Sequence, residues 1–412
     1  VATPVALKKS SYWRMRSARA AAAAVGVAKG DDFPTITGGY IAQRARPVSG
    51  TTGLIANWLN RWGPQISLTY SIFDFGVGEA RLEAAEARLL AANLAQNRVL
   101  QEVIFQVEQA YYQLIGIDAL VRVNEQALKN LETALDAARR RRDSGVATVA
   151  DVYRSETQVA QARLTLTRSR GEFEKARGQL ASVVGMPVNS SFKVQTLAAP
   201  PQTQEAVKGI TAYLQTAKLS RPDLVAAQAQ VDAFRATATA ASRVGLPSID
   251  FAANAQQNLW YQTGNPVPLR PNNQTYFAGI NVRIPIFSGF RDTYQQRQAE
   301  MQAQQAEATR DALFRQSQLE VWQAYYDLQT VNGSIASTEA LVKSAEQTAQ
   351  AVLARYQGGF GTILDLITAQ QDETSARTQR IQSYLDWYTV LALLNLAVGA
   401  GNLMTTKTEN KQ

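Results

Sequence analysis

The side chains that most often carry out chemistry in proteins are scarce in this sequence. Its 412 residues contain no cysteine and no histidine. This excludes Cys–His and Ser–His–Asp nucleophiles, zinc or haem sites built from Cys and His, and a disulfide framework. Carboxylates remain, and they could hold magnesium or cleave a glycoside. Because no group of them converges in the sequence, we predict no catalytic residue, no cofactor, no metal site and no enzyme activity.

The densest charge in the chain is the run Arg139–Arg142. The formal net charge of +8, from 42 Lys and Arg against 34 Asp and Glu, is mild for this length. We interpret the run as a solvated helix end whose cations complement the C-terminal helix dipole. A contact with an acidic protein surface is the alternative. Nucleic acid is not an expected partner, because no nucleic-acid-binding motif accompanies the run.

A duplication at constant spacing organises the sequence. Residues 109–114 (QAYYQL) are echoed by residues 323–328 (QAYYDL), and 323 − 109 = 214. Three further pairs of segments share this offset: 71–76 with 285–290, 144–152 with 358–366, and 183–185 with 397–399. The period is far longer than the 20–50 residues of solenoid repeats, so we expect two duplicated halves instead of an array.

Each half is predicted to contain a long helical hairpin. Residues 76–142 lack proline and are rich in Ala, Leu, Glu, Gln and Arg, which are strong helix formers. A second helix is predicted over 148–184, and its apolar residues follow the seven-residue pattern typical of coiled coils: Val152, Val159, Ala162, Leu166, Phe173, Ala176 and Leu180. The hairpin tip then lies near residue 145. The second half repeats this with helices over 290–356 and 362–398 and a tip near residue 359.

Ahead of each long helix the pattern changes to strict alternation. Residues 64–73 and 275–286 alternate apolar with small or polar residues, and preceding strands are expected over 35–43 and 248–261. A soluble hairpin with one face on a core is the commoner explanation of such alternation. A transmembrane strand, apolar toward lipid and polar toward a lumen, is the other.

Two observations favour the transmembrane explanation. No other segment supplies a large apolar surface that could cover two lone hairpins. Aromatic side chains also cluster where a membrane interface would lie, namely Trp58, Trp62, Trp260 and Tyr261. Four strands cannot close a pore alone, so several copies of the chain would be needed in the membrane.

The duplication also sets the expected domain boundaries. The first structural repeat spans 1–185 and the second 221–400, each with a helix, two strands, a long helix, a tip and a returning helix. A proline-rich linker, the equatorial segment, covers 186–220 and contains Pro187, Pro200 and Pro201. Residues 401–412 form a polar C-terminal tail.

These features together resemble the TolC-like outer membrane factors of Gram-negative bacteria, the outer membrane efflux protein family. The tip pattern Arg-x3-Gly-x5-Asp occurs twice, as Arg141, Gly145 and Asp151 and then as Arg355, Gly359 and Asp365. The strand-to-helix junctions at 72–76 and 285–290 are similar to those of the same family. The resemblance covers nearly the whole chain.

The resemblance implies an α+β membrane protein that assembles as a homotrimer. Each chain would give four strands to a twelve-stranded outer membrane β-barrel, which continues into a long periplasmic α-helical barrel of coiled-coil hairpins. The implied function is a passive exit duct of a tripartite efflux pump, as in drug export, or of a type I secretion system. Its partners would be outer membrane lipid, a periplasmic adaptor and, through it, an inner membrane transporter. A soluble coiled-coil scaffold or adaptor protein is the alternative function.

The same resemblance gives the tips their expected roles. Repeated three times around an axis, Asp365 would form an electronegative ring that narrows the periplasmic end, with Thr368 beside it and Asp151 as a further candidate. Alternatively, both aspartates only complement the dipole and the free N–H groups at the start of the returning helices. Adaptor docking is expected at Arg141, Gly145, Thr148, Val149, Arg355, Gly359, Thr362 and Ile363.

Overall fold

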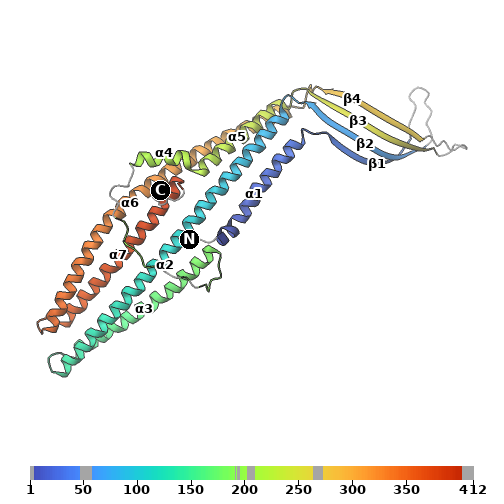
Figure 1. Cartoon of the computed structure of the whole chain (residues 1–412). Coiled ribbons are helices and arrows are strands. Elements are labelled where there is room, and N and C mark those ends of the chain that lie inside the picture. The colour runs from blue at the N-terminus through green and yellow to red at the C-terminus, as the bar shows by residue number, and fades with distance from the viewer. Residues whose placement is uncertain are drawn as a thin grey trace, which may run out of the picture. The chain divides into compact units, whose positions relative to one another are not determined.

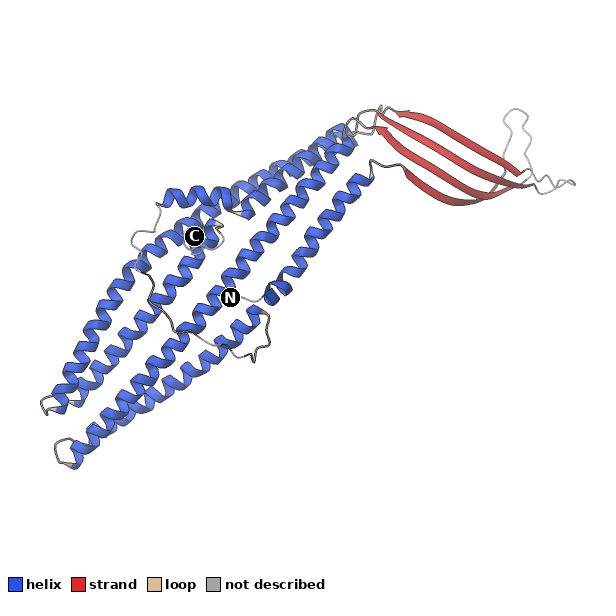
Figure 2. Cartoon of the chain, viewed as in Figure 1, coloured by secondary structure: helices blue, strands red, loops and turns tan. Residues whose placement is uncertain are grey.

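The computed structural model of the chain describes residues 4–46, 58–190, 192, 195–201, 209–262 and 272–400. These residues form helices and one sheet (Figures 1 and 2). The helices are α1 (Pro4–Gly30), α2 (Val77–Asp143), α3 (Val149–Val184), α4 (Ile210–Ser220), α5 (Pro222–Arg243), α6 (Arg291–Gln357) and α7 (Ile363–Val398). The strands are β1 (Thr35–Ala45), β2 (Leu59–Phe73), β3 (Ser248–Gln262) and β4 (Asn272–Arg283).

The duplication seen in the sequence recurs in the helices. α2 and α6 each contain 67 residues, and α3 and α7 each contain 36. The first residues of the long helices are 291 − 77 = 214 apart, and those of the returning helices are 363 − 149 = 214 apart. The helical hairpins of the two halves therefore share the period of the sequence.

The chain divides into two compact units. The tip unit contains Leu94–Val225 and Ala312–Gln412, and the strand unit contains Arg16–Asn93 and Ala226–Asp311. In the tip unit the seven-residue pattern of α3 is largely buried: Val152, Val159, Ala176 and Leu180 pack into clusters with side chains of α2, and Leu166 is buried as well. The returning helix thus packs on the long helix as the coiled-coil pattern predicts.

Helix α4 lies within the stretch that the sequence indicated only as a linker. Its Tyr213 and Ala217 are buried in a cluster with Tyr325 of α6 and with Trp387 and Leu394 of α7. An eleven-residue helix between proline-rich segments has little intrinsic stability, so this packing is what holds it. Helix α4 of the equatorial segment is therefore part of the tip unit's core.

The sheet is antiparallel with the strand order β1-β2-β3-β4. Directly opposed residues share a face, and neighbours along a strand face opposite ways. One face therefore carries the row Ile36, Leu68, Ala253 and Ala278, together with Tyr70, Phe251 and Ile280; the other carries Thr37, Ser67, Asn254 and Phe277, together with Gln65, Gln256 and Thr275. The first face is mainly apolar, and the second is mainly polar, although it also carries Ile41, Ala252 and Phe277.

The apolar face is not covered by any part of the chain that the structure describes. Ile36, Ile66, Tyr276 and Ile280 on this face are all more than half exposed. A soluble hairpin would bury such a face on a core. The structure thus bears out the alternation read from the sequence and leaves the apolar face open.

Several strand boundaries differ from the sequence pattern, and two of the larger differences have a local cause. β2 begins at Leu59 and continues through Gly63 and Pro64, where the sequence indicated a start at 64. A Cβ atom on Gly63 would lie 1.7 Å from the carbonyl oxygen of Gln257, so only glycine permits this close strand pairing. β4 ends at Arg283, three residues short of the expected end, because Pro285 has no amide hydrogen for a ladder bond.

Both strand-to-helix junctions use two successive residues in the left-handed region. Phe75 and Gly76 have φ of 55° and 80°, and Gly289 and Phe290 have φ of 67° and 64°. The pairs are 214 residues apart, yet the phenylalanine and the glycine exchange places. A non-glycine residue in this region costs about 1–2 kcal/mol, so the conserved feature of the two repeats is the turn and not the residue type at each position.

None of the helices in the described part of the chain combines the length and the apolar character that a membrane span needs.

Candidate functional site

The two hairpin tips are the strongest candidate for a functional site, and both are built on the same turn. The chain reverses through Gly145 (φ 74°) and Gly359 (φ 89°), in the region that glycine enters without steric cost. The residue after each glycine closes the turn by donating its backbone N–H to the preceding helix: Val146 to the carbonyl of Arg141 at 2.8 Å, and Phe360 to that of Arg355 at 3.0 Å. The two tips thus share one backbone design.

Each returning helix begins with a capping box. Thr148 accepts a hydrogen bond from the amide of Asp151 and donates its own amide to that carboxylate at 3.0 Å. Thr362 and Asp365 repeat the arrangement, with the amide of Thr362 3.2 Å from the carboxylate. These bonds from Thr148 and Thr362 hold the pKa of both carboxyl groups below their usual value. The helix-capping role proposed for both aspartates is therefore present in the structure.

A contact that the sequence did not reveal joins the two tips. The guanidinium of Arg141, at the end of α2, donates a hydrogen bond of 2.6 Å to the carbonyl oxygen of Tyr356 in the last turn of α6. It also lies 4.7 Å from the centre of the Tyr356 ring. Tyr356 is only 3% exposed and packs with Ala134, Ala138, Ile363, Leu366 and Ile367. Arg355, the counterpart of Arg141 in the second repeat, is instead exposed.

Most of the side chains expected to dock an adaptor are accessible. Exposed positions are Gly145, Thr148, Val149, Arg355, Gly359 and Thr362, while Arg141 is half-buried. Ile363 differs, because it is 4% exposed and packs inside the tip cluster. The apolar side chain that projects beside it is Phe360, which is 83% exposed. Ile363 thus supports the tip from within, and Phe360 offers a contact surface that the sequence analysis did not single out.

The expected aperture residues lie on one helix face. Asp365 and Thr368 are both exposed and sit three residues apart on α7, so their side chains are neighbours. Asp151 is half-buried at the start of α3. A ring around an axis requires further copies of the chain, so the aperture stays a prediction.

The arginine run at the first tip has partners within the chain. Arg139 pairs with Glu156 at 2.8 Å, Arg142 pairs with Asp143, and Arg140 donates to the carbonyl of Asp136 at 3.3 Å. Arg139, Arg140 and Arg142 are exposed and fit the interpretation as a solvated helix end, whereas Arg141 is half-buried against the second tip.

The aromatic residues expected at the membrane interface lie toward the far end of the sheet from the helices. Trp58 is exposed, and Trp62 is half-buried on the apolar face, opposite Ala42. Trp260 and Tyr261 belong to β3, but their side chains lie outside the described residues. Their role as interface anchors remains a prediction.

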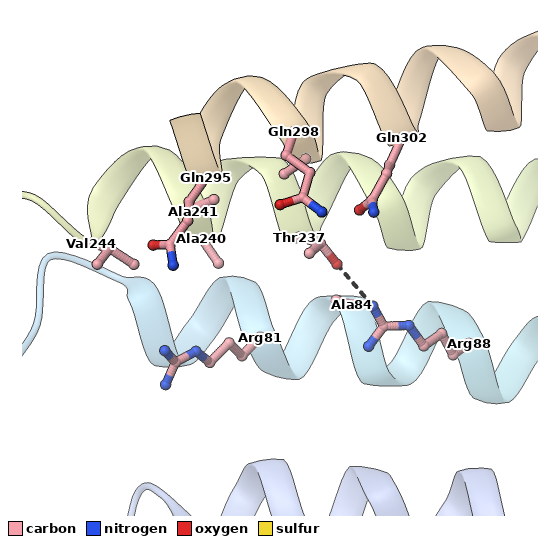
Figure 3. A pocket seen from close by; sticks show the side chains of 11 residues that line it. Arg81, Ala84, Arg88, Thr237, Ala240, Ala241, Val244, Gln295, Gln298 and Gln302 are labelled. Carbon is pink, nitrogen blue, oxygen red and sulfur yellow. Dashed lines mark hydrogen bonds between the residues drawn. The ribbon is translucent and has the colours of Figure 1, made fainter. Parts of the chain in front are cut away.

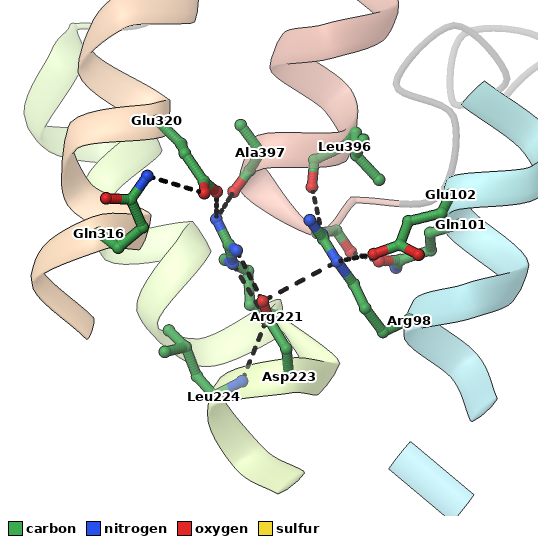
Figure 4. A network of polar contacts seen from close by, with 11 residues as sticks. Arg98, Gln101, Glu102, Arg221, Asp223, Leu224, Gln316, Glu320, Leu396 and Ala397 are labelled. Atoms are coloured by element: carbon green, nitrogen blue, oxygen red, sulfur yellow. Dashed lines mark hydrogen bonds and ion pairs between the residues drawn. The ribbon is translucent and has the colours of Figure 1, made fainter. Parts of the chain in front are cut away.

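A buried ionic network holds the end of α7 (Figure 4). Arg221 is 1% exposed and donates to Asp223 at 2.6 Å, to Glu320 of α6 at 2.7 Å and to the carbonyl of Ala397 at 3.1 Å. Burial alone would lower the pKa of this guanidinium, but the hydrogen bonds and charges of both carboxylates raise it. Because Asp223 and Glu320 compensate the buried charge, Arg221 remains a cation inside the tip unit.

Two further side chains complete this network from α2. Arg98 donates to the carbonyl of Leu396 at 2.9 Å, and Gln101 donates to that of Gly399 at 3.0 Å. The last four carbonyls of a helix have no partner within the helix. Side chains from α2 and from the α4–α5 turn therefore supply the donors that the end of α7 needs.

The comparisons with known proteins agree with this geometry. The family model of the outer membrane efflux proteins matches residues 15–186 and 213–400. This chain belongs to the outer membrane efflux protein family.

Individual relatives support the assignment. The chain is 27% identical over 365 residues to protein CyaE of Bordetella pertussis, covering 88% of this chain and 75% of that one. It is 26% identical over 365 residues to the outer membrane efflux protein BepC of Brucella suis, covering 88% and 76%. Its fold is similar to that of the outer-membrane channel OprN, with a TM-score of 0.83 at 20% identity over 95% of this chain and 87% of that one.

Family membership confirms the TolC-like fold and the location predicted from the sequence. The protein is an outer membrane exit duct that extends into the periplasm, and its family consists of channel-forming proteins and not of enzymes. The alternative of a soluble scaffold is thereby overturned.

One hollow in the strand unit also bears on chemistry (Figure 3). It has a volume of about 380 Å³ and is lined by Arg81 and Arg88 of α2, by Thr237 and its neighbours on α5, and by Gln295, Gln298 and Gln302 of α6. Arg88 donates to the hydroxyl of Thr237 at 2.9 Å. None of the residues that line this hollow is Asp or Glu, so the hollow offers no carboxylate that could act as a general acid or base.

Proposed function

We propose that three copies of this chain close one barrel in the outer membrane and form the exit duct of a tripartite export system. The observation that carries the proposal is the four-stranded sheet, which has one exposed apolar face and two outer edges, on β1 and β4, without a partner strand within the described chain. Unpaired edges in lipid leave backbone groups without hydrogen bonds. Pairing β4 of one copy with β1 of the next satisfies them, and three copies give twelve strands, an even number within the range of outer membrane barrels.

The tips are the proposed docking end of this duct. Arg141 and Tyr356 tie the first tip to the second within one chain. The exposed Val146, Phe360 and Leu364 then provide apolar side chains for the hairpin of a periplasmic adaptor. An adaptor that binds these side chains and separates the two tips would open the duct, and through the adaptor the duct would receive cargo from an inner membrane transporter.

At the closed end, we assign Asp365 to an electronegative ring with Thr368 beside it. Both side chains are exposed, and the lowered pKa of Asp365 keeps it ionised at neutral pH. Three carboxylates around one axis bind cations and concentrate them at the entrance. The duct itself needs no catalytic residue, because the transporter supplies the energy.

Single-channel conductance in planar lipid bilayers tests the duct and its aperture together. The wild-type protein is expected to form channels that millimolar divalent cations block from the tip side. The variant Asp365→Ala should lose most of this block, while Asp151→Ala, which removes the matching carboxylate of the first tip, should keep it. Channels with unchanged block in Asp365→Ala would refute the ring, and the absence of channels would refute the duct.

A further inference from the structure

The end of the sheet away from the helices carries basic side chains without acidic ones. The sequence contains no Asp or Glu between Phe33 and Phe73, or between Phe251 and Arg291. Three arginines of the first hairpin, Arg44, Arg46 and Arg61, lie near the end where β1 stops and β2 begins. The strand ends that face away from the helices are therefore cationic.

Two of these arginines share one aromatic ring. The guanidinium carbon of Arg44 lies 4.7 Å from the centre of a Trp58 ring, and that of Arg46 lies 5.8 Å from it. All three side chains are exposed. Two like charges on one ring repel each other, and an anion between them would relieve this repulsion.

The register of the sheet places Arg44 on the exposed apolar face. Arg44 has the same parity along β1 as Ile36 and Tyr40, so it continues the exposed apolar face. Arg61 has the opposite parity and lies on the polar face, where it donates to the side chain of Asn258 at 2.7 Å. Arg44 and Arg61 thus lie on opposite faces of the sheet, although they are close together in the pairing of β1 with β2.

We propose that Arg44, Arg46 and Trp58 form a binding site for the phosphate of a lipid headgroup in the outer leaflet of the outer membrane. Guanidinium groups bind phosphate with two parallel hydrogen bonds. An indole at the membrane interface stacks against the guanidinium groups and lies at the level of the lipid headgroups. The absence of acidic residues in both hairpins leaves no competing carboxylate in the sequence of this region. The proposal rests on the proposed function, because it takes the apolar face to contact lipid with the helices on the periplasmic side.

The test uses native mass spectrometry of the full-length protein in detergent, titrated with purified lipid A that carries its phosphates or has been dephosphorylated. Each basic side chain at an anionic membrane surface contributes about fivefold in affinity, so Arg44→Gln with Arg46→Gln should weaken binding of the phosphorylated lipid about 30-fold. Arg61→Gln is the matched control, because it removes one arginine of the same hairpin from the other face, and it should bind like the wild type. The pair Arg44→Lys with Arg46→Lys keeps both charges but loses the two parallel hydrogen bonds of each guanidinium group, so it should recover only part of the affinity.

Equal binding of phosphorylated and dephosphorylated lipid by the wild type would overturn the proposal. So would undiminished binding by the double glutamine variant, or an equal loss in Arg61→Gln. Arg46→Gln alone provides a second test, because Arg46 lies beyond the end of β1 and its replacement leaves the strand pairing intact; a loss of about fivefold is expected, and no loss would contradict the site. The number of chains in each particle is read from the same spectra, so a failure of assembly is distinguished from a failure of lipid binding.

Discussion

Arg141 at the end of α2 reaches the last turn of α6, where it hydrogen-bonds the carbonyl oxygen of Tyr356 at 2.6 Å and covers the ring of the same residue at 4.7 Å. The two helices belong to different repeats of the chain. This guanidinium joins the two tips beside the apolar cluster of Ala134 and Ala138 with Tyr356, and it binds a backbone atom that a substitution of Tyr356 would leave in place. The aromatic ring and the carbonyl can be separated experimentally.

Replacing Arg141 with alanine should loosen the first tip from the second. Loss of the hydrogen bond and of the contact with the ring removes about 1–2 kcal/mol from the closed arrangement. The expected result is a larger or more frequent open conductance in planar bilayers. Arg140→Ala removes the same charge from a side chain that donates to the carbonyl of Asp136 in its own helix, and it should leave the conductance unchanged. Identical conductance in the two variants would show that the tether does not hold the tips.

The capping boxes predict a loss of tip stability in acid. The pKa of Asp151 and of Asp365 is lowered in the folded protein, so each carboxylate stabilises the fold above its unfolded pKa of about 4, and this contribution is lost as the pH falls through the folded value. Circular dichroism should show a thermal midpoint that falls between about pH 5 and pH 3. The fall should be smaller in Asp151→Asn with Asp365→Asn. Asp143→Asn, at the same tip but outside the cap, serves as the control; an equal pH dependence in all three proteins would count against the caps.

Two helical glycines should respond oppositely to alanine. A Cβ atom on Gly116 of α2 would lie 2.2 Å from Cδ1 of Leu385, whereas one on Gly333 of α6 would meet nothing within 4 Å. Crowding a packed contact costs about 1–3 kcal/mol, which exceeds the roughly 1 kcal/mol that alanine adds in a helix. Thermal unfolding in detergent should therefore show Gly116→Ala below the wild type and Gly333→Ala above it. A higher midpoint for both variants would mean that α2 and α7 pack less closely than the structure shows.

The buried network around Arg221 should contribute far more to stability than an exposed pair. Arg221→Met leaves Glu320 without its cation and leaves Asp223 with only the more distant Arg98, at 3.8 Å, which we expect to cost about 3 kcal/mol. Arg235→Met breaks the exposed pair with Glu307 and should cost less than about 1 kcal/mol. Equal thermal midpoints for the two variants would show that Arg221 does not hold the end of α7.

The periodic parts of the fold could be predicted from the sequence. The offset of 214 and the seven-residue pattern of α3 are spacings that can be counted along the sequence, and both recur in the structure. The alternation of β2 likewise predicted an apolar and a polar face. These patterns are readable because helices and strands bury one face at a fixed period.

Contacts between segments far apart in the sequence could not be predicted in this way. The two tips share one pattern, so nothing in the sequence indicates that Arg141 binds Tyr356 while Arg355 stays exposed. Arg221 stands between a serine and a proline, a sequence that predicts a loop with an exposed charged side chain. Its burial follows only from the meeting of α6, α7 and the α4–α5 turn. Ile363 looked like a docking residue for the same reason, because Ala134 and Ala138, its α2 neighbours in the tip cluster, are more than 200 residues away in the sequence.

The number of chains in the native assembly tests the proposed duct most directly. The protein is extracted from outer membranes with a mild detergent, and the mass of the intact particle is measured. Three chains per particle, extracted only with detergent, is the predicted result, because three four-stranded sheets leave no free strand edge. A single chain, or protein that remains in the aqueous fraction without detergent, would contradict a barrel closed by three copies.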